Sequence, residues 1–306
     1  AKNVNSSTAL LRAALNGQTA CVQALLDAKA DIAAKDVNGD TALLRAAYKG
    51  HTECVQALLD AKAHIEAEDV DGNTALLCAA YEGHTACAQA LLDAKAHIEA
   101  KNASGNTALL RAAYIGHISC AQALLDAKAD IEAKNVDGDT ALLAAARDGH
   151  LACLHALLDA KADIEAKNVN SSTALLRAAL NGQTACAQAL LDAKADIEAK
   201  DVDGDTALLR AALDGHTECA QALLNAKARI EANANDGFTA LLRAAENGHT
   251  ECVQALLEAK ADIEATSNSG TSSLMAAACG GQSECVNVLV TAYIAIAPQF
   301  RPPHLL

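Results

Sequence analysis

The sequence predicts an all-α solenoid, in which nine copies of a paired antiparallel helix unit with a projecting β-hairpin loop stack in a row. The first observation is a period, because the string Thr-Ala-Leu-Leu recurs every 33 residues. Its copies start at Thr8, Thr41, Thr74, Thr107, Thr140, Thr173, Thr206 and Thr239, and Ser-Ser-Leu-Met takes its place at Ser272. The second observation is composition: 52% hydrophobic residues with only 2% aromatic residues favour helices that pack through Ala and Leu. We therefore expect a single array over residues 1–306, with residues 298–306 as a C-terminal tail.

The first helix of each unit is predicted from residues such as 41–50. Thr41 can cap the helix, because its hydroxyl is free to accept from a first-turn N–H. Leu43, Ala46 and Ala47 follow at helical spacing. Gly50 is expected to end this short helix.

A second helix and a loop complete the unit. The helix is expected from about Thr52 to Ala61, with Cys54, Val55, Leu58 and Leu59 facing inward. Asp71-Gly72 then supplies a tight turn of the hairpin type.

This order of features resembles the ankyrin repeat, whose pattern runs Thr-Pro-Leu-His, Ala-Ala, Gly-His, a Leu-Leu pair and Gly-Ala-Asp-Val-Asn. The resemblance covers all nine units, over roughly residues 2–297. Gly-His stands in six of them, and Gln replaces the His at Gln18, Gln183 and Gln282. The resemblance implies a non-catalytic scaffold that binds a protein partner on a concave face made by hairpin tips and first-helix ends.

Three departures from the ankyrin pattern affect local structure. Ala42 replaces the usual Pro, and Leu44 replaces the usual His, so the Thr–His hydrogen bond of the motif cannot form. Lys62 and its equivalents replace the usual Gly at the end of the second helix. If that position is left-handed here too, each Cβ is unfavourable by about 1–2 kcal/mol.

The cysteines predict a reducing compartment rather than a disulfide framework. Nine of the eleven lie thirteen residues after a repeat start, on the apolar side of the second helix. Stacked helices lie about 8–10 Å apart, which exceeds the ~7 Å Cα limit for a disulfide. We expect this cysteine ladder to be buried and reduced, and Cys279 to react first. The expected location is the cytoplasm, or a host cytoplasm if the chain is part of a secreted effector.

Charge and motif content exclude several functions. The net charge of −14 repels phosphate backbones and anionic membranes, so neither nucleic acid nor a membrane is an expected partner. The histidines and cysteines form ladders that do not converge, so we expect no metal site. No spacing sets a nucleophile beside a base and no phosphate loop is present, so we expect no enzyme and no cofactor.

The two ends of the array leave alternatives open. Residues 3–21 recur unchanged at 168–186, and the first unit shows no polar outer face. The last unit departs from the consensus after Gly270 and carries apolar Val290, Ile294 and Ile296. Two further hypotheses follow: an array that self-associates end to end, and the targeting segment of a larger enzyme or effector.

The candidate partner-binding residues are those that vary within the repeats. Tyr48, Tyr81 and Tyr114 occupy one position in three consecutive repeats, in a chain with four tyrosines. Tyrosine is a favoured interface anchor, because it presents a rigid face with a polar tip. Packing against neighbouring repeats is the alternative. Phe238, on the loop before Thr239, is a second aromatic candidate.

Arg45 and Arg111 complete the candidate set. They belong to a ladder of arginines three residues before the tyrosine position, and therefore on the same helix face. A groove for acidic side chains is one interpretation. The other is a self-satisfied network with the loop acids Asp40, Asp139 and Asp205.

Overall fold

The computed structural model describes residues 7–296, which fold into eighteen α-helices arranged as nine pairs. The first helices of the pairs are α1 (Ala9–Leu15), α3 (Ala42–Tyr48), α5 (Ala75–Glu82), α7 (Ala108–Ile115), α9 (Ala141–Asp148), α11 (Ala174–Leu180), α13 (Ala207–Leu213), α15 (Ala240–Asn247) and α17 (Ser273–Cys279). The second helices are α2 (Thr19–Asp27), α4 (Thr52–Asp60), α6 (Thr85–Asp93), α8 (Ile118–Asp126), α10 (Leu151–Asp159), α12 (Thr184–Asp192), α14 (Thr217–Asn225), α16 (Thr250–Glu258) and α18 (Ser283–Ile296). This confirms the predicted all-α solenoid.

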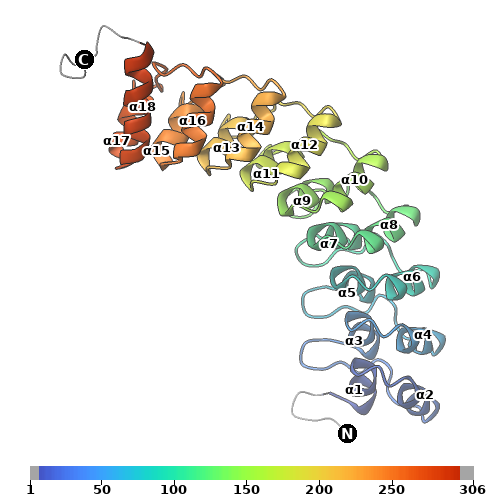
Figure 1. Ribbon diagram of the computed structural model, residues 1–306. Coiled ribbons are helices and arrows are strands. Elements are labelled where there is room, and N and C mark those ends of the chain that lie inside the picture. The colour runs from blue at the N-terminus through green and yellow to red at the C-terminus, as the bar shows by residue number, and fades with distance from the viewer. Residues whose placement is uncertain (1–6, 297–306) are drawn as a thin grey trace. The chain divides into compact units, whose positions relative to one another are not determined.

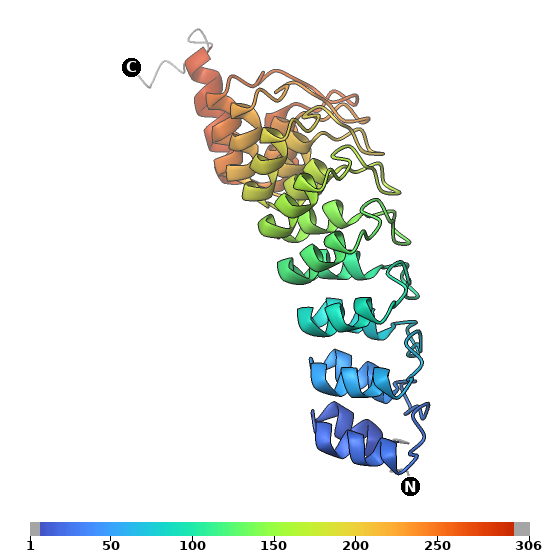
Figure 2. The same ribbon diagram turned by 90° about the vertical axis from the view of Figure 1, so that its right-hand side faces the viewer.

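The chain divides into two compact units: residues 1–145 with 152–163, and residues 146–151 with 164–306. In the first unit, α1, α3, α5 and α7 lie side by side, and each packs on the second helix of its own repeat (Figure 1). In the second unit, α11, α13, α15 and α17 repeat this arrangement. Within each unit the loops between repeats lie along one edge of the helices (Figure 2).

The first helices form the inner layer of the core. Thr41 caps α3 as predicted, because its Oγ1 accepts a hydrogen bond of 3.3 Å from the Leu44 amide. Leu43, Leu44, Ala46 and Ala47 are buried. Leu44, at the position of the usual histidine, is thus an additional core side chain.

A left-handed lysine follows the second helix in eight of the nine pairs. Helix α4 ends at Asp60, and Cys54, Val55 and Leu58 are buried, whereas Leu59 is half-buried. Lys62 has φ of 63°, and the Ala63 amide donates to the Leu58 carbonyl at 2.9 Å. The other lysines with positive φ are Lys29, Lys95, Lys128, Lys161, Lys194, Lys227 and Lys260. The position is therefore left-handed at all eight lysines, and the conditional strain of about 1–2 kcal/mol per Cβ applies to each of them.

In the described residues, the loops between repeats lack the paired strands of the hairpins that the sequence predicts. Asp69 N donates to Asn73 O at 3.1 Å, and Gly72 (φ 77°) closes the predicted tight turn. Among the described residues, strand pairing amounts to two isolated bridges, Asn233 with Thr239 and Thr266 with Ser272. The turn prediction is right, but the extended arms of a hairpin are absent from residues 7–296 because each loop folds back after only a few residues.

Neighbouring repeats are joined by the Gly-His motif. The ring nitrogen Nε2 of His51 lies 3.1 Å from the Leu15 carbonyl oxygen, which belongs to the preceding repeat. Gly17 lies directly beneath this ring, and a Cβ there would approach His51 Nδ1 to 2.6 Å. The histidine thus caps a backbone carbonyl, and the cap spans two repeats.

The cysteine ladder is buried at eight of its nine positions, and Cys21 is the exception. Four of these thiols contact a hydroxyl of the repeat before: Cys54 Sγ lies 3.4 Å from Thr19 Oγ1 and Cys87 Sγ lies 3.3 Å from Thr52 Oγ1, and Cys120 and Cys285 make the same contact. Cys21 is exposed because no described repeat precedes it. The prediction that all nine would be buried is therefore wrong at this position.

The proposed tail, residues 298–306, lies outside the described residues. Of the helices between residues 7 and 296, none is long and apolar enough to cross a membrane.

Among the loops that the structure describes, one carries a non-glycine residue where its equivalents carry glycine, which gives a stability prediction. Ser171 has φ of 58° at this position. Replacing Ser171→Gly should raise the free energy of unfolding by about 0.5–1 kcal/mol, because relief of left-handed strain exceeds the entropic loss from glycine. The measurement is unfolding in urea. The matched control is Gly270→Ser, where φ is 78° and a Cβ would meet no neighbouring atom, so that stability should fall. No change in either variant would contradict the assignment of strain.

Thiol reactivity gives a second prediction. Cys21 and Cys279 are exposed and should be alkylated first. Burial raises the pKa of Cys219 and of Cys252 to about 12, so their reactive thiolate form is scarce at neutral pH. Iodoacetamide labelling of the native protein, followed by peptide mass spectrometry, measures the order. Labelling of Cys219 as fast as Cys279 would contradict the described burial.

Candidate interaction surface

A groove in the first unit brings together four of the six predicted partner-binding residues: Arg45, Tyr48, Tyr81 and Arg111. Its cavity has a volume of about 420 Å³. Helices α3, α5 and α7 supply these side chains, and the loops before α3 and α5 supply the opposite wall. We call this cavity the loop-side groove. The other two predicted residues, Tyr114 and Phe238, are not among its lining residues.

Arg45 is held at one end of the loop-side groove by loop carboxylates. Its Nη2 lies 2.6 Å from Asp36 Oδ2 and 2.9 Å from Asp40 Oδ2. The arginine ladder therefore pairs with loop acids here, as one of the two interpretations of the sequence predicts.

Arg111 lies at the other end, stacked on an aromatic ring. Its guanidinium carbon lies 4.1 Å from the centre of the Tyr81 ring, within the range of a cation–π contact. Its Nη1 also donates to Asn73 Oδ1 at 3.3 Å. Tyr81 is half-buried as a result, so this ring combines packing with a place in the groove wall.

The three tyrosines are not equivalent in the structure. Tyr48 is 39% exposed, with the Lys49 ammonium 5.1 Å from its ring centre. Tyr114, one repeat beyond Tyr81, is 46% exposed. Their equal spacing in sequence thus produces two exposed rings and one that Arg111 covers.

Phe238 belongs to the second unit, on the loop before α15. Its ring is half-buried, and the Arg243 guanidinium carbon lies 4.6 Å from its centre. This contact resembles the pair of Arg111 with Tyr81 rather than a freely exposed ring.

Burial and charge shape the electrostatics of the loop-side groove. Burial raises the pKa of Asp40 from 3.8 to about 6, and Arg45 lowers it. The neighbouring carboxylates of Asp36, Asp69 and Asp71 raise this pKa further. The groove wall therefore carries crowded negative charge.

Cys78 is a groove residue that the sequence interpretation did not select. It stands four residues after Thr74, where six other repeats carry arginine. It is buried, and burial, followed by the nearby charges of Asp69 and Asp40, raises its pKa to about 12. The replacement of arginine by Cys78 in the ladder was visible in the sequence and could have pointed to this residue.

The loop tips carry a second feature that the sequence interpretation missed. Exposed valines stand there at Val37, Val70, Val136, Val169 and Val202. Val70 is 72% exposed and also lines the loop-side groove. Its amide donates to the Asn38 carbonyl at 3.0 Å, so the backbone of neighbouring loops holds this apolar tip in place.

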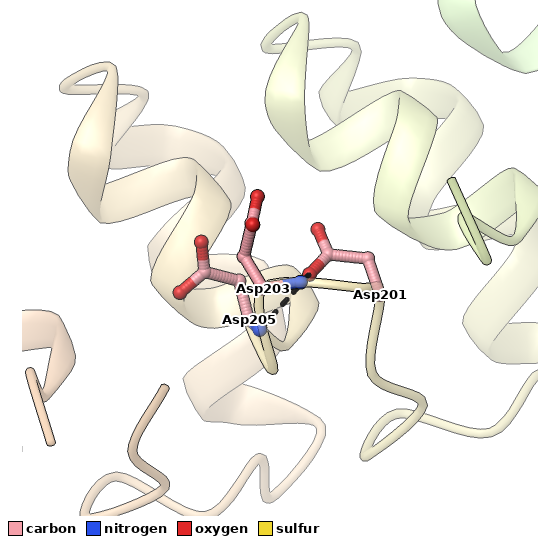
Figure 3. A group of neighbouring side chains, drawn as sticks. All are labelled: Asp201, Asp203 and Asp205. Carbon is pink, nitrogen blue, oxygen red and sulfur yellow. Dashed lines mark hydrogen bonds between the residues drawn. The ribbon is translucent and has the colours of Figure 1, made fainter. Parts of the chain in front are cut away.

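One acidic cluster in the second unit has the spacing of a metal site. Within residues 7–296, it is the group of Asp201, Asp203 and Asp205, whose ligand atoms lie within 4.8 Å of one another (Figure 3). Arg210 already binds all three carboxylates, with N–O distances of 2.6, 2.7 and 3.3 Å. A guanidinium is thus the cation that this cluster holds.

Three other hollows lie beside Gln23, Gln89 and Gln188, which are equivalent positions of different repeats. A feature that repeats in this way follows from the stacking geometry. The loop-side groove differs because its tyrosines and Cys78 depart from the consensus.

The last helix pair exposes apolar side chains, including Leu274, Met275, Val290 and Ile296. Nothing in the described residues tests whether they contact another copy. End-to-end self-association therefore stays a prediction, as does the targeting role within a larger protein.

Comparisons with known proteins agree with the fold. The family described as ankyrin repeats (three copies) matches residues 1–69, 63–135, 95–168, 130–201, 200–267 and 230–299. Among solved structures, the chain is similar to the ankyrin repeat domain of Bcl-3, described as a unique member of the IkappaB protein family. The TM-score is 0.61 with 27% identity, over 67% of this chain and 94% of that one. The comparison with curated proteins found no match.

The raised pKa of Asp40 gives a pH prediction. Because the folded pKa (about 6) exceeds the ordinary 3.8, the stabilisation from this group is complete below about pH 4 and is lost as pH rises through 6. Asp40→Asn should remove this loss, so the variant gains stability relative to the parent between pH 4 and 7. Urea unfolding across this range measures it. Asp137→Asn, in an exposed loop outside the groove, is the control with the same charge change. An equal gain in the control would contradict the prediction.

Proposed function

Because the chain belongs to the ankyrin-repeat family, we propose that it is a non-catalytic interaction module that binds a partner protein in the loop-side groove. We take this groove as the part of the concave face that contacts the partner, because first-helix ends and loops line it together. The observation that carries the proposal is the joint presence of Tyr48, Tyr81, Arg45 and Arg111 around one cavity of about 420 Å³. Tyrosine and arginine are the residue types most enriched among interface hot spots, together with tryptophan.

The shape of the loop-side groove suits a protruding side chain of a partner. Tyr48 stands exposed at one rim, and Val70 stands exposed on the loop tip that also lines the groove. A partner that covered this region would bury a ring face and an aliphatic tip together. Such an apolar contact with a polar surround is typical of an interface centre.

The chemistry of the groove favours binding over catalysis. The buried Cys78 thiol has a pKa of about 12, chiefly because of burial, and therefore stays protonated at neutral pH. A protonated thiol is a poor nucleophile. Asp36 and Asp40, for their part, form ion pairs with Arg45.

The charge of the chain indicates the kind of partner. A net charge of −14 speeds the approach of a basic protein and slows that of an acidic one. Together with the exposed rings, this favours a protein partner with a basic contact surface.

The proposal predicts that the tyrosines contribute to affinity. The probe is a peptide selected from a random displayed library on the immobilised chain. Replacing Tyr48, Tyr81 and Tyr114 together with alanine should weaken its binding by several kcal/mol, since interface anchors contribute at least ~2 kcal/mol each. Tyr48→Ala and Tyr114→Ala alone should change stability by less than about 0.5 kcal/mol, because both side chains are exposed. Calorimetric titration and urea unfolding measure the two effects.

The matched control uses the same position in the second unit, four repeats later. Leu180 and Leu213 stand there in place of Tyr48 and Tyr81. The double variant Leu180→Ala with Leu213→Ala should keep full affinity for the probe. If it loses as much affinity as the tyrosine variant, or if the tyrosine variant loses stability but no affinity, the groove is not the binding site.

A further inference from the structure

The loop-side groove lies at Cys78, one of three positions at which the arginine ladder is interrupted, the others being Ala144 and Ala276. Among the described repeats, three loops begin with an aspartate at the equivalent position: Asp36, Asp69 and Asp201. Nine residues after two of them stand Arg45 and Arg210, whereas Cys78 stands nine residues after Asp69. The other described loops have Asn, Ala or Ser at this position. Asp69 is therefore a loop aspartate without the arginine of its own repeat.

The two complete pairs define what this position binds. Arg45 Nη2 lies 2.6 Å from Asp36 Oδ2. Arg210 donates from Nε to Asp201 Oδ2 at 2.7 Å and from Nη2 to Asp203 Oδ2 at 2.7 Å. The same loop position thus holds a guanidinium wherever the sequence supplies one.

Asp69 has only neutral donors in its place. Its Oδ1 accepts from the amides of Asp71 and Asn73, both at 2.8 Å, and its Oδ2 accepts from Asn73 Nδ2 at 2.9 Å. An amide donor carries no net positive charge, whereas a guanidinium would both donate and balance the charge of the carboxylate. The amide of Asn73 therefore satisfies an oxygen of Asp69 without neutralising its charge.

The groove has room for the missing group. Cys78 is much shorter than the arginine of the equivalent position, and the cavity of about 420 Å³ that it lines is also lined by Asp69 and Asp71. A single water occupies only ~30 Å³, so the cavity admits a whole side chain. Tyr48 and Tyr81 line it too, and each ring already lies against a cation, Lys49 or Arg111.

We propose that the loop-side groove receives the guanidinium of an arginine side chain from the partner protein, between the carboxylates of Asp69 and Asp71. This inference rests on the proposed function and names the residue type that the partner inserts. The inserted arginine takes the role that Arg210 has toward Asp201 and Asp203 in the second unit. A guanidinium suits the site better than an ammonium, because its planar fork can bind two carboxylates and stack on a ring.

The test uses the whole chain and three capped peptides, Gly-X-Gly, in which X is arginine, citrulline or lysine. Titration followed by amide NMR shifts should show saturable changes between Asp69 and Tyr81 with the arginine peptide. Citrulline has the same shape without the charge, and should bind at least tenfold more weakly. Lysine should fall between the two. Equal binding of arginine and citrulline would overturn the inference, and so would displacement of the arginine peptide by Ca²⁺ alone at equimolar concentration.

The decisive variant places an arginine of this chain at the position of Cys78. Cys78→Arg should pair with Asp69, raise the urea midpoint and abolish binding of the arginine peptide. Ala144→Arg adds the same charge at the equivalent position two repeats later, and should leave peptide binding intact. If Cys78→Arg does not fold, Asp69→Asn decides, and should weaken binding at least tenfold. Persistent binding in the folded variant, or in Asp69→Asn, would overturn the inference.

The experiments distinguish a failure of the proposed function from a failure of the arginine inference. A library peptide that needs the tyrosines but tolerates Cys78→Arg would support the proposed function and overturn the arginine inference. An arginine peptide that binds, with no selected peptide requiring the tyrosines, would support the cation site and overturn the tyrosine-based interface.

Discussion

The stacking contact between successive repeats is the interaction on which the rest of the structure depends. No repeat is complete alone: His51 lies on the Leu15 carbonyl, and the Cys54 thiol meets the Thr19 hydroxyl of the repeat before. The same separation recurs between His216 and Leu180 in the second unit. Because each contact is made to the neighbour, the residues that make it are nearly identical in every repeat. The strain at the left-handed lysines is tolerated for a related reason. The stacked helices on both sides of the turn hold its backbone in one conformation.

The loops follow a second constraint, which is neutralisation of their own carboxylates. Asp201 binds the amides of Asp203 and Asp205 at 3.0 Å and thereby shapes the turn before α13 (Figure 3). Asp201 thereby carries a buried charge, which Arg210 then balances. Turn geometry and ion pairing are therefore linked through one side chain. Asp69 shapes its turn in the same way, but its repeat has no arginine to balance the carboxylate. The aspartate therefore keeps its structural role, and its negative charge can interact with a cation from outside the repeat.

The sequence predicted the features that depend on one repeat and missed several that depend on contacts between repeats. The Thr41 cap follows from local chemistry and is confirmed, and the left-handed Lys62, which the sequence left conditional, is found in the structure. The exposure of Cys21 depends on the repeat before it, so one repeat alone could not reveal it. The unequal tyrosines have the same origin: Tyr81 is covered because Arg111, from the next repeat, stacks on it. The groove could be recognised only in the structure, because its walls come from the first helices of three successive repeats and from two loops.

A homogeneous array of this kind can gain a specific site through few changes. Four repeats beyond the groove, the positions of Tyr48, Cys78 and Tyr81 are occupied by Leu180, Arg210 and Leu213. None of the three groove residues donates a side-chain hydrogen bond to the stacking ladder formed by the histidines and the Thr–Cys pairs. In a chain whose stability is a sum over neighbouring repeats, such changes act locally and leave the other interfaces intact. The scaffold and the proposed binding site can therefore vary independently, which is consistent with repeats that remain almost identical while one groove differs.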